Sequence, residues 1–388
     1  MNLQNKKILL IIHAGALGGA ERQALGLAKY LIKDYNCKVD LLLTFSDETT
    51  KEFDDFAKEC FIEKILFFGT PYVYLPKEIS IKNLKRLKWS IQSLMRLRKG
   101  LKEYKHEIVI PFLNFPSKIA FYIYKMIPSV KFTFWHQLGL DNIKLDYFES
   151  IAVNNVPCVI GNAPNCLDMF EDPYHINKKK LNVLPQYVTL EKIKVDKVLL
   201  KRNYNIPENS IVIGMVAHFR SDKYHDLLLD AFIKLNKKCN NVHLLFLGNK
   251  DNNIPSHDKY LNLKEKIEIN KLENKVTILS NENVNEVLNI IDIGVLVSLI
   301  EGTPNAVMEY MLYGIPVIAS NHPGCKGLLE DSEFLIENDE AVLIEKLIQL
   351  VGNEELRVQE GNRNSELIKK YDIETYIKKL EAIITKYI

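Results

Sequence analysis

Short apolar runs alternate with longer amphipathic stretches along the whole chain, a pattern that is typical of parallel βαβ units. Helical periods fill residues 19–34, 51–59, 80–105 and 116–127 of the first half. Between them we expect strands at Lys7–Ile12, Lys38–Thr44, Ile62–Phe67, Ile108–Pro111, Lys131–His136, Cys158–Ile160 and Leu181–Leu184. The first half therefore predicts an α/β domain built on a parallel sheet.

The same scheme restarts after residues 185–210, which are polar, lack a clear period and are interpreted as the domain linker. Strands are expected at Ile211–Val216, Val242–Leu247, Val276–Leu279, Ile293–Val297 and Pro316–Ala319. Helices are expected at 223–238, 257–270, 283–290, 304–313, 338–352 and 354–387, the last one broken near Tyr371-Asp372. Two successive parallel-sheet domains are the simplest architecture, and their ligand lies at the carboxyl ends of the strands.

Composition narrows the class of protein. The 388 residues are 47% hydrophobic and carry a net charge of +2, and neither half is basic enough for a dedicated nucleic-acid binder. The six cysteines form no CxxC pair, which favours free thiols in a reducing cytoplasm. The apolar run Ile8–Ile12 is shorter than the roughly 7–15 residues of a signal peptide, and no stretch reaches the roughly 18 of a membrane helix. We expect a soluble, cytoplasmic protein.

Residues 292–320, DIGVLVSLIEGTPNAVMEYMLYGIPVIAS, carry the most informative pattern. A strand runs into a loop, and a helix is predicted to open at Thr303-Pro304, with Thr303 as the N-cap and Pro304 as the first helical residue. Gly314 is expected to end this helix in the left-handed conformation. Gly302 would let the backbone approach an anion that is bound at the helix N-terminus.

Two glutamates flank this helix start. Glu301 lies just outside the helix and Glu309 lies on it, so that one carboxylate could face a sugar while the other reaches a ribose. The alternative interpretation is that both glutamates are solvated and that the cap is purely structural.

The segment resembles the donor-site motif of the retaining GT-B glycosyltransferases of glycosyltransferase family 4, S-x-x-E-G-x-P followed by a second Glu and G-x-P-V. The matching residues are Ser298, Glu301, Gly302, Pro304, Glu309, Gly314, Pro316 and Val317. The resemblance implies that Glu309 binds the ribose and that the donor sugar is held by Glu301 and the backbone of Gly302, Thr303, Pro304 and Asn305. It also implies two Rossmann-like domains facing each other across a cleft: residues 1–190 for the acceptor and 191–370 for the nucleotide sugar. Residues 371–388 would form a helix that packs back toward the first domain.

Three further segments match in the family's order. Residues 15–27, GALGGAERQALGL, resemble its glycine-rich loop, which places Gly18 and Gly19 near the donor phosphate. No G-x-G-x-x-G fits these glycines, so a nicotinamide dehydrogenase is disfavoured. Residues 212–229 resemble a strand-loop with a basic pair, and Arg220 and Lys223 would neutralise the diphosphate leaving group. Two basic loop residues could equally be exposed to solvent only.

The third segment, residues 132–139, places His136 at the end of a predicted strand, where family members have a His near the donor sugar and its phosphate. A lone His could instead be an internally hydrogen-bonded residue. In residues 321–330, Gly324 is expected to contact the diphosphate. The chain departs from the family at Ala217-His218, where many relatives have Gly-Arg, at Asn249, which replaces an acid, and at Gly327, where relatives often have Glu.

The sequence therefore predicts a retaining, hexosyltransferase-type enzyme that moves a sugar from a nucleotide-diphosphate sugar to a hydroxyl of a glycan or lipid-linked acceptor. A bacterial surface polysaccharide (capsule, O-antigen or lipopolysaccharide) is the expected product. There is no Asp-x-Asp motif, and we expect no metal and no other cofactor. The alternatives are a non-hydrolysing nucleotide-sugar epimerase and a non-catalytic nucleotide-sugar-binding partner.

Residues 80–105 form a basic amphipathic pattern with a single acid, Glu103. Such a helix is either an ordinary surface helix with its apolar stripe in the core or a membrane-surface element. We expect it to contact an anionic membrane, which would place the protein peripherally on the cytoplasmic face of the inner membrane.

Overall fold

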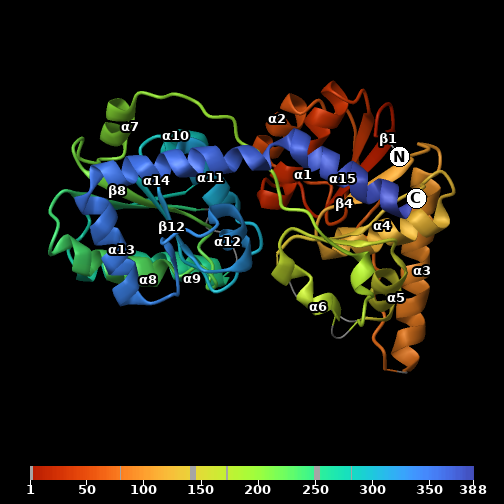
Figure 1. The fold of residues 1–388 in the computed structure, drawn as a ribbon. Coiled ribbons are helices and arrows are strands. Elements are labelled where there is room, and N and C mark those ends of the chain that lie inside the picture. The colour runs from red at the N-terminus through yellow and green to blue at the C-terminus, as the bar shows by residue number, and fades with distance from the viewer. Residues whose placement is uncertain (1–2, 79, 140–145, 172–173, 249–253, 281) are drawn as a thin grey trace. The chain divides into compact units, whose positions relative to one another are not determined.

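The computed structural model describes residues 3–78, 80–139, 146–171, 174–248, 254–280 and 282–388. The chain divides into two compact units, residues 1–189 with 373–388 (unit 1) and residues 190–372 (unit 2) (Figure 1). Asn249, one of the departures from the family pattern, lies outside the described residues. Within them, no helix is both long and apolar enough to cross a membrane.

Unit 1 contains a parallel sheet of order β3-β2-β1-β4 and a second parallel sheet of order β5-β6-β7. The strands are β1 (Lys7–Ile12), β2 (Lys38–Leu43), β3 (Ile65–Leu66), β4 (Ile108–Pro111), β5 (Trp135–Gln137), β6 (Val159–Gly161) and β7 (Leu181–Val183). The helices are α1 (Gly19–Lys33), α2 (Lys51–Glu59), α3 (Ile81–Leu101), α4 (Asn114–Met126), α5 (Tyr147–Asn155), α6 (Asp168–Glu171) and α15 (Ile373–Tyr387).

The core of unit 1 explains why β1 is apolar from Ile8 to Ile12. In β1, Ile8, Leu10 and Ile12 pack into one hydrophobic cluster, while Leu9 and Ile11 pack into another. Because successive side chains of a strand point to opposite faces, a strand that is covered on both faces has no polar position. The C-terminal helix α15 contributes Ile377 and other apolar residues to the first of these clusters.

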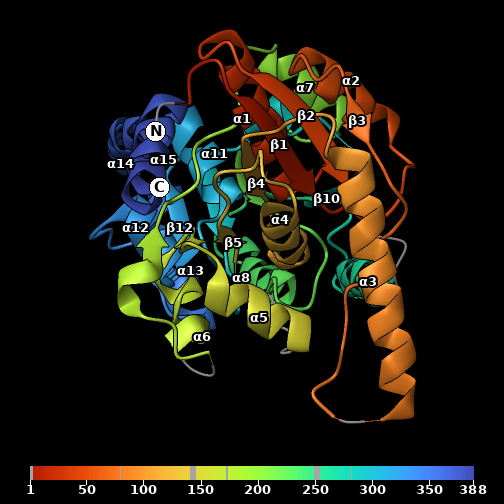
Figure 2. The same ribbon diagram turned by 90° about the vertical axis from the view of Figure 1, so that its right-hand side faces the viewer.

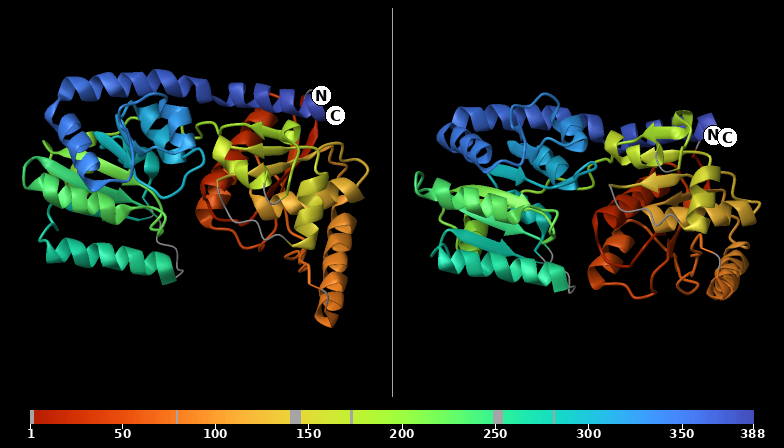
Figure 3. Two further views of the ribbon diagram at one scale, coloured as in Figure 1. Left: turned by 60° about the horizontal axis from the view of Figure 1, so that its bottom comes forward. Right: turned by 90° about the horizontal axis from the view of Figure 1, so that it is seen from below.

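Unit 2 contains one parallel sheet of order β10-β9-β8-β11-β12-β13 with helices on both faces (Figure 3). The strands are β8 (Ile211–Val216), β9 (Val242–Leu247), β10 (Val276–Leu279), β11 (Ile293–Leu296), β12 (Val317–Ser320) and β13 (Leu335–Ile336). The helices are α7 (Lys197–Asn203), α8 (His225–Asn236), α9 (Ile254–Ile269), α10 (Val284–Leu288), α11 (Asn305–Tyr313), α12 (Pro323–Leu329), α13 (Glu340–Gly352) and α14 (Glu354–Leu367).

The strand order of unit 2 reverses its direction between β8 and β11. At such a switch point the loops that follow the two strands diverge, which opens a crevice at the carboxyl edge of the sheet. The loops concerned are residues 217–224 and 297–304, the two segments of unit 2 in which the sequence predicts catalytic residues.

Several predicted elements were wrong in extent. The strand expected at Lys131–His136 begins only at Trp135, because Phe132 forms an isolated bridge to Ile108 of the other sheet. The strand expected at Ile62–Phe67 shortens to β3, an edge strand that pairs with Leu41 and Leu42 alone. Residues 185–210, which were interpreted as the linker, contain α7. The elements α5, α12 and β13 were not predicted. The predicted break near Tyr371 is confirmed, since a 3₁₀ turn at Ile368–Tyr371 separates α14 from α15.

Candidate functional site

The two loops at the switch point of unit 2 are held together by backbone hydrogen bonds. Lys223 and Ser298 form an isolated antiparallel bridge. On either side of it, Tyr224 N donates to Val297 O at 3.0 Å and Leu299 N donates to Asp222 O at 2.7 Å. Because β8 and β11 are neighbours in the sheet, this short pairing brings residues that are far apart in the sequence into one site.

The pairing brings together two of the predicted catalytic residues. Lys223 Nζ donates a hydrogen bond to Glu301 Oε1, and the two side chains are only 17% and 10% exposed. Asp222 Oδ2 lies 3.7 Å from the same Nζ. Arg220 Nε donates to Asp222 Oδ1 at 2.8 Å, with more than half of the Arg220 side chain exposed. These four side chains form a continuous row of alternating charge, Arg220–Asp222–Lys223–Glu301, with a formal sum of zero.

Asp222 is the member of this row that the sequence analysis missed. It lies between the two predicted cations, in the stretch Arg220-Ser221-Asp222-Lys223, and its partners become evident only when the loop is folded. His218, the departure from the family pattern, is exposed at the start of the loop, and its carbonyl accepts from Arg220 N at 2.7 Å.

A second network holds Ser298, the first residue of the predicted motif. Ser298 N donates to Ser320 Oγ at 2.9 Å, and Ser320 Oγ donates to Asn338 Oδ1 at 2.6 Å. Ser298 O accepts from Asn338 Nδ2 at 2.7 Å and from His322 Nε2 at 2.9 Å. Because a carbonyl oxygen can only accept, Nε2 of His322 carries the proton. Ser320, His322 and Asn338 were not predicted, although Ser320 ends β12 and the other two lie within two residues of the ends of β12 and β13 at this edge of the sheet.

The helix after the motif differs from the prediction at its start. Pro304 is extended and occupies the N-cap position, and α11 begins at Asn305 rather than at Pro304. Thr303 therefore precedes the cap instead of forming it, which was a wrong prediction. The cause is the backbone of Pro304, whose φ of −78° and ψ of 122° are extended rather than helical, so that the helix starts one residue later. The predicted end of the helix is confirmed, because Gly314 adopts the left-handed conformation with φ 71° and ψ 31°.

The start of α11 is packed closely against that of α12. A Cβ atom on Gly324 would lie 1.5 Å from the carbonyl oxygen of Gly302, so that only glycine fits this position. A Cβ on Gly327 in the same helix would meet nothing within 4 Å. Gly324 therefore has a steric role, because it allows the start of α12 to lie against the loop before α11. This role does not depend on any contact of Gly324 with a ligand.

Helix α11 is anchored to the sheet by Tyr310. Its hydroxyl accepts from Val216 N at 2.7 Å and donates to Gly214 O at 3.2 Å, and burial raises the pKa of this phenol. Glu309 precedes Tyr310 in α11 and is only 8% exposed. The predicted ribose ligand is thus held on a helix whose position relative to β8 is fixed.

Gly18, Gly19 and His136 belong to unit 1. Gly18 is the N-cap of α1, which begins at Gly19, and it makes no side-chain cap hydrogen bond. A Cβ on Gly18 would lie 2.8 Å from Glu21 Oε2. Burial raises the pKa of Glu21, and backbone hydrogen bonds at Glu21 and Gly18 oppose this shift. A carboxylate of the chain itself therefore lies at the helix N-terminus that was expected to approach a phosphate.

His136 is the central residue of β5 and is buried. Its Nδ1 lies 2.8 Å from Pro111 O, and because that carbonyl can only accept, Nδ1 carries the proton. Its backbone N–H donates to Ser117 Oγ at 2.9 Å. Burial lowers the pKa of His136 to about 4, although the hydrogen bond to Pro111 opposes this shift. His136 is consequently neutral near pH 7 with a lone pair on Nε2, so it can accept a hydrogen bond but cannot supply positive charge to a phosphate.

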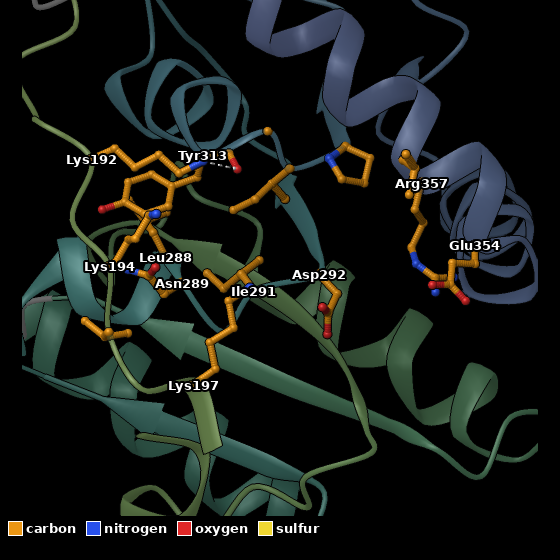
Figure 4. Close-up of a pocket in the computed structure, with 15 residues that line it drawn as sticks. Lys192, Lys194, Lys197, Leu288, Asn289, Ile291, Asp292, Tyr313, Glu354 and Arg357 are labelled. Atoms are coloured by element: carbon orange, nitrogen blue, oxygen red, sulfur yellow. Dashed lines mark hydrogen bonds between the residues drawn. The ribbon is translucent and has the colours of Figure 1, made fainter. Parts of the chain in front are cut away.

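A separate cavity of about 600 Å³ lies at the opposite, amino edge of the sheet of unit 2 (Figure 4). Its walls include Lys192, whose Nζ donates to Tyr313 O at 3.2 Å. They also include Asp292, which accepts from Val212 N at 2.8 Å, and Arg357, which donates to Leu350 O at 2.6 Å. Since these polar groups stabilise the local backbone, and Glu301 lies beyond the other end of β11, this cavity is not the predicted donor site.

Residues 196–384 match the family described as Glycosyl transferases group 1. An uncharacterized glycosyltransferase of Haemophilus influenzae is 28% identical over 208 residues, which cover 50% of this chain and 57% of that protein. The UDP-Gal:alpha-D-GlcNAc-diphosphoundecaprenol alpha-1,3-galactosyltransferase of Escherichia coli is 26% identical over 227 residues, 55% of each chain. The matched regions thus span little more than half of these two relatives.

Among solved structures, the HepE protein of Anabaena in complex with UDP and glucose superposes with a TM-score of 0.78 at 15% identity. The match covers 98% of this chain and 99% of HepE. The two-domain GT-B architecture expected from the sequence is confirmed by this likeness.

Proposed function

We propose that this chain, a glycosyltransferase whose residues 196–384 match the Glycosyl transferases group 1 family, transfers a sugar from a nucleotide-diphosphate sugar to a hydroxyl of a glycan or lipid-linked acceptor, with retention of anomeric configuration. As its pathway we propose the synthesis of a bacterial surface polysaccharide at the cytoplasmic face of the inner membrane. The name of the Escherichia coli relative, a transferase for a diphosphoundecaprenol-linked sugar, supports this proposal. A UDP-sugar is the first donor to test, because that name and the ligands of HepE both contain UDP.

The observation that carries the proposal is the Lys223–Glu301 pair at the switch point of unit 2. An ammonium group has three N–H donors, so Lys223 can keep its bond to Glu301 and still donate to a phosphate oxygen. Arg220 uses its Nε for Asp222, which leaves the other guanidinium N–H groups of this exposed side chain for the diphosphate. The two cations would stabilise the negative charge that develops on the leaving diphosphate, and we propose that they do so without a metal ion.

Glu301 would act on the sugar as a hydrogen-bond acceptor. A carboxylate that is already bonded to an ammonium group is a weak nucleophile, which argues against a covalent glycosyl intermediate on Glu301. In the proposed front-face reaction, the acceptor oxygen bonds to the anomeric carbon on the face from which the phosphate oxygen departs. The hydroxyl proton passes to that phosphate oxygen, so the nucleoside diphosphate leaves with it. Orientation and electrostatics then supply most of the rate enhancement.

The neutral state of His136 restricts the role of this residue. We propose that its Nε2 accepts a hydrogen bond from a hydroxyl of the donor sugar, and that the phosphates are bound by other groups. This proposal is supported by the hydrogen bond from Nδ1 to Pro111 O, which leaves only Nε2 as an acceptor.

The test measures the release of free nucleoside diphosphate from a panel of UDP-, GDP-, ADP- and dTDP-sugars, with and without glycan acceptors. Release that depends on an acceptor, together with an NMR spectrum that shows the donor's anomeric configuration in the product, supports retaining transfer. Epimerised donor formed without an acceptor would instead identify an epimerase. Binding of a nucleotide sugar without any turnover would favour a non-catalytic partner.

A further inference from the structure

Helix α3 exposes large apolar side chains over its N-terminal half and middle. The exposed fractions are 83% for Ile81, 67% for Leu84, 50% for Ile91 and 49% for Met95. The core of unit 1 instead receives Leu94, Leu97 and Leu101 of the same helix. The apolar positions of α3 therefore belong to two sets, and only one set is buried.

Four of the five exposed large apolar residues of α3 form one continuous stripe. The fifth, Trp89, lies outside the stripe and packs edge-on against the ring of Tyr72. Positions 81, 84, 88, 91 and 95 are separated by three and four residues, a spacing that aligns side chains along one face of a helix. Lys88 is the only charged member of this stripe. Another face of α3 contacts the protein, where Ser93 Oγ accepts from Tyr72 N at 3.1 Å and Ser90 Oγ accepts from Tyr74 N at 3.3 Å.

The position of α3 in unit 1 leaves this stripe accessible. The helix runs along the edge of the unit, and its N-terminal end projects past the neighbouring helices (Figure 2). The stripe is most exposed at this end, at Ile81 and Leu84.

The charge of α3 is of one sign. Between Ile81 and Leu101 there is no acidic residue, whereas seven positions are basic: Lys82, Lys85, Arg86, Lys88, Arg96, Arg98 and Lys99. In the described part of the chain, none of these seven side chains forms a salt bridge. Arg96 and Arg98 donate only to the carbonyl oxygens of Phe68 and Met126.

We propose that the stripe of Ile81, Leu84, Lys88, Ile91 and Met95 docks on an anionic lipid bilayer, with its aliphatic side chains at the acyl boundary and the basic side chains among the headgroups. A second copy of the chain is a poorer occupant, because it would bring an equally basic helix against this one. A nucleic acid would pair with the cations but offers no apolar surface for four aliphatic side chains. The proposal concerns the attachment of the chain to a membrane and not the transfer reaction. It rests on the proposed function in one respect, that a lipid-linked acceptor would lie in the same membrane.

The experiment is co-sedimentation of the full chain, without donor or acceptor, with vesicles of phosphatidylcholine alone or mixed with phosphatidylglycerol. The apolar variant replaces the four aliphatic residues: Ile81→Gln, Leu84→Gln, Ile91→Gln and Met95→Gln. The matched control replaces four similarly exposed aliphatic residues of unit 2: Leu199→Gln, Leu261→Gln, Ile269→Gln and Val358→Gln. The charge variant carries Lys85→Gln, Lys88→Gln, Arg96→Gln and Lys99→Gln.

We expect the wild type and the control to bind the anionic vesicles and not the neutral ones. The apolar variant should bind them about tenfold more weakly or worse, because each buried aliphatic side chain contributes to partitioning. The charge variant should lose binding by a similar factor, most clearly at low salt. Both α3 variants should keep wild-type transfer to a water-soluble acceptor, which separates a failure of docking from a failure of the proposed function.

Three results would overturn the proposal. In the first, the apolar variant binds as well as the wild type, which would mean that charge alone attracts the helix. In the second, the wild type binds neither kind of vesicle. In the third, light scattering shows a wild-type dimer that dissociates in the apolar variant, which would make the stripe an interface between copies of the chain.

Discussion

Removing either partner of the Lys223–Glu301 pair should lower catalysis sharply while leaving the fold intact. Losing one electrostatic stabiliser of the transition state costs about 10²–10³ in rate. We therefore expect Glu301→Gln and Lys223→Ala each to lower kcat/KM by about 100-fold, which corresponds to about 2.7 kcal/mol. Lys197→Ala, an exposed lysine of the same unit, is the matched control and should leave kcat/KM unchanged.

The same variants should destabilise the protein only moderately. The two side chains are 17% and 10% exposed, so the pair lies between a surface ion pair, worth about 0–1 kcal/mol, and a fully buried one, whose disruption costs about 3–5 kcal/mol. We expect each single variant to lose about 1–2 kcal/mol of unfolding free energy. The double variant should lose less than the sum, because the second substitution removes a charge whose partner in this pair the first has already removed.

Initial rates across a range of donor concentrations, together with urea denaturation, measure both effects on the same proteins. Lys223→Arg keeps the charge and should recover part of the activity, which a purely structural role for the ammonium would not require. If either Glu301→Gln or Lys223→Ala keeps more than half of the wild-type turnover, that residue has no part in the reaction. Strictly additive losses of stability would show that the two side chains do not interact in solution.

Other predictions address individual residues and the metal requirement. Burial holds the pKa of His136 at about 4, below its ordinary value of 6.5, so the unfolded chain binds a proton first as the pH falls. Stability that is present above pH 6.5 should be lost toward pH 4. His225 and His243, whose pKa values burial also lowers to about 4, contribute to this loss, so His136→Gln should reduce the dependence in urea titrations without abolishing it; an unchanged slope would contradict the buried, neutral state. Glu309→Ala should weaken the binding of free nucleoside diphosphate by about tenfold in calorimetry, as expected for a lost hydrogen bond to a charged group, and unchanged affinity would remove it from the ribose role. Gly324→Ala should cost about 1–3 kcal/mol and impair donor binding, because its Cβ overlaps the Gly302 carbonyl, whereas Gly327→Ala in the same helix should be neutral or slightly stabilising; equal stabilities of the two variants would refute this steric argument. Activity should survive dialysis against EDTA, and a loss that is restored by Mg²⁺ would show that a metal ion supplies the charge assigned to the two cations.

The sequence alone was sufficient wherever a feature is set by neighbouring residues. The strands β1, β8 and β9 were predicted with the boundaries that the structure has, because strands covered on both faces are continuous apolar runs. The end of α11 at Gly314 followed from the conformational freedom of glycine before a proline-led strand. The candidate site residues of unit 2 could be named because the motif that resembles the glycosyltransferase family is local: Glu301 and its neighbours lie within one strand-loop-helix.

Local pattern was a weaker guide to short elements. The strands β5, β6 and β7 have three residues each. The strand expected at Lys131–His136, which overlaps β5, was too long at its start because Phe132 bridges a different sheet. The start of α11 was placed one residue early, because proline is frequent at the first helical position, whereas Pro304 is extended and forms the N-cap.

Only the tertiary structure decided which charges meet. Lys223 and Glu301 are 78 positions apart, and they pair because β8 and β11 are adjacent in the sheet, which no local period reveals. The same adjacency gives Asp222 its place between two cations. For α3, the spacing of the apolar residues correctly predicted an amphipathic helix. However, the helix carries two sets of apolar residues, and each set repeats at intervals of three and four residues. Which set is buried depends on the partner surface that the rest of unit 1 supplies, and that surface is assembled from segments distant in the chain.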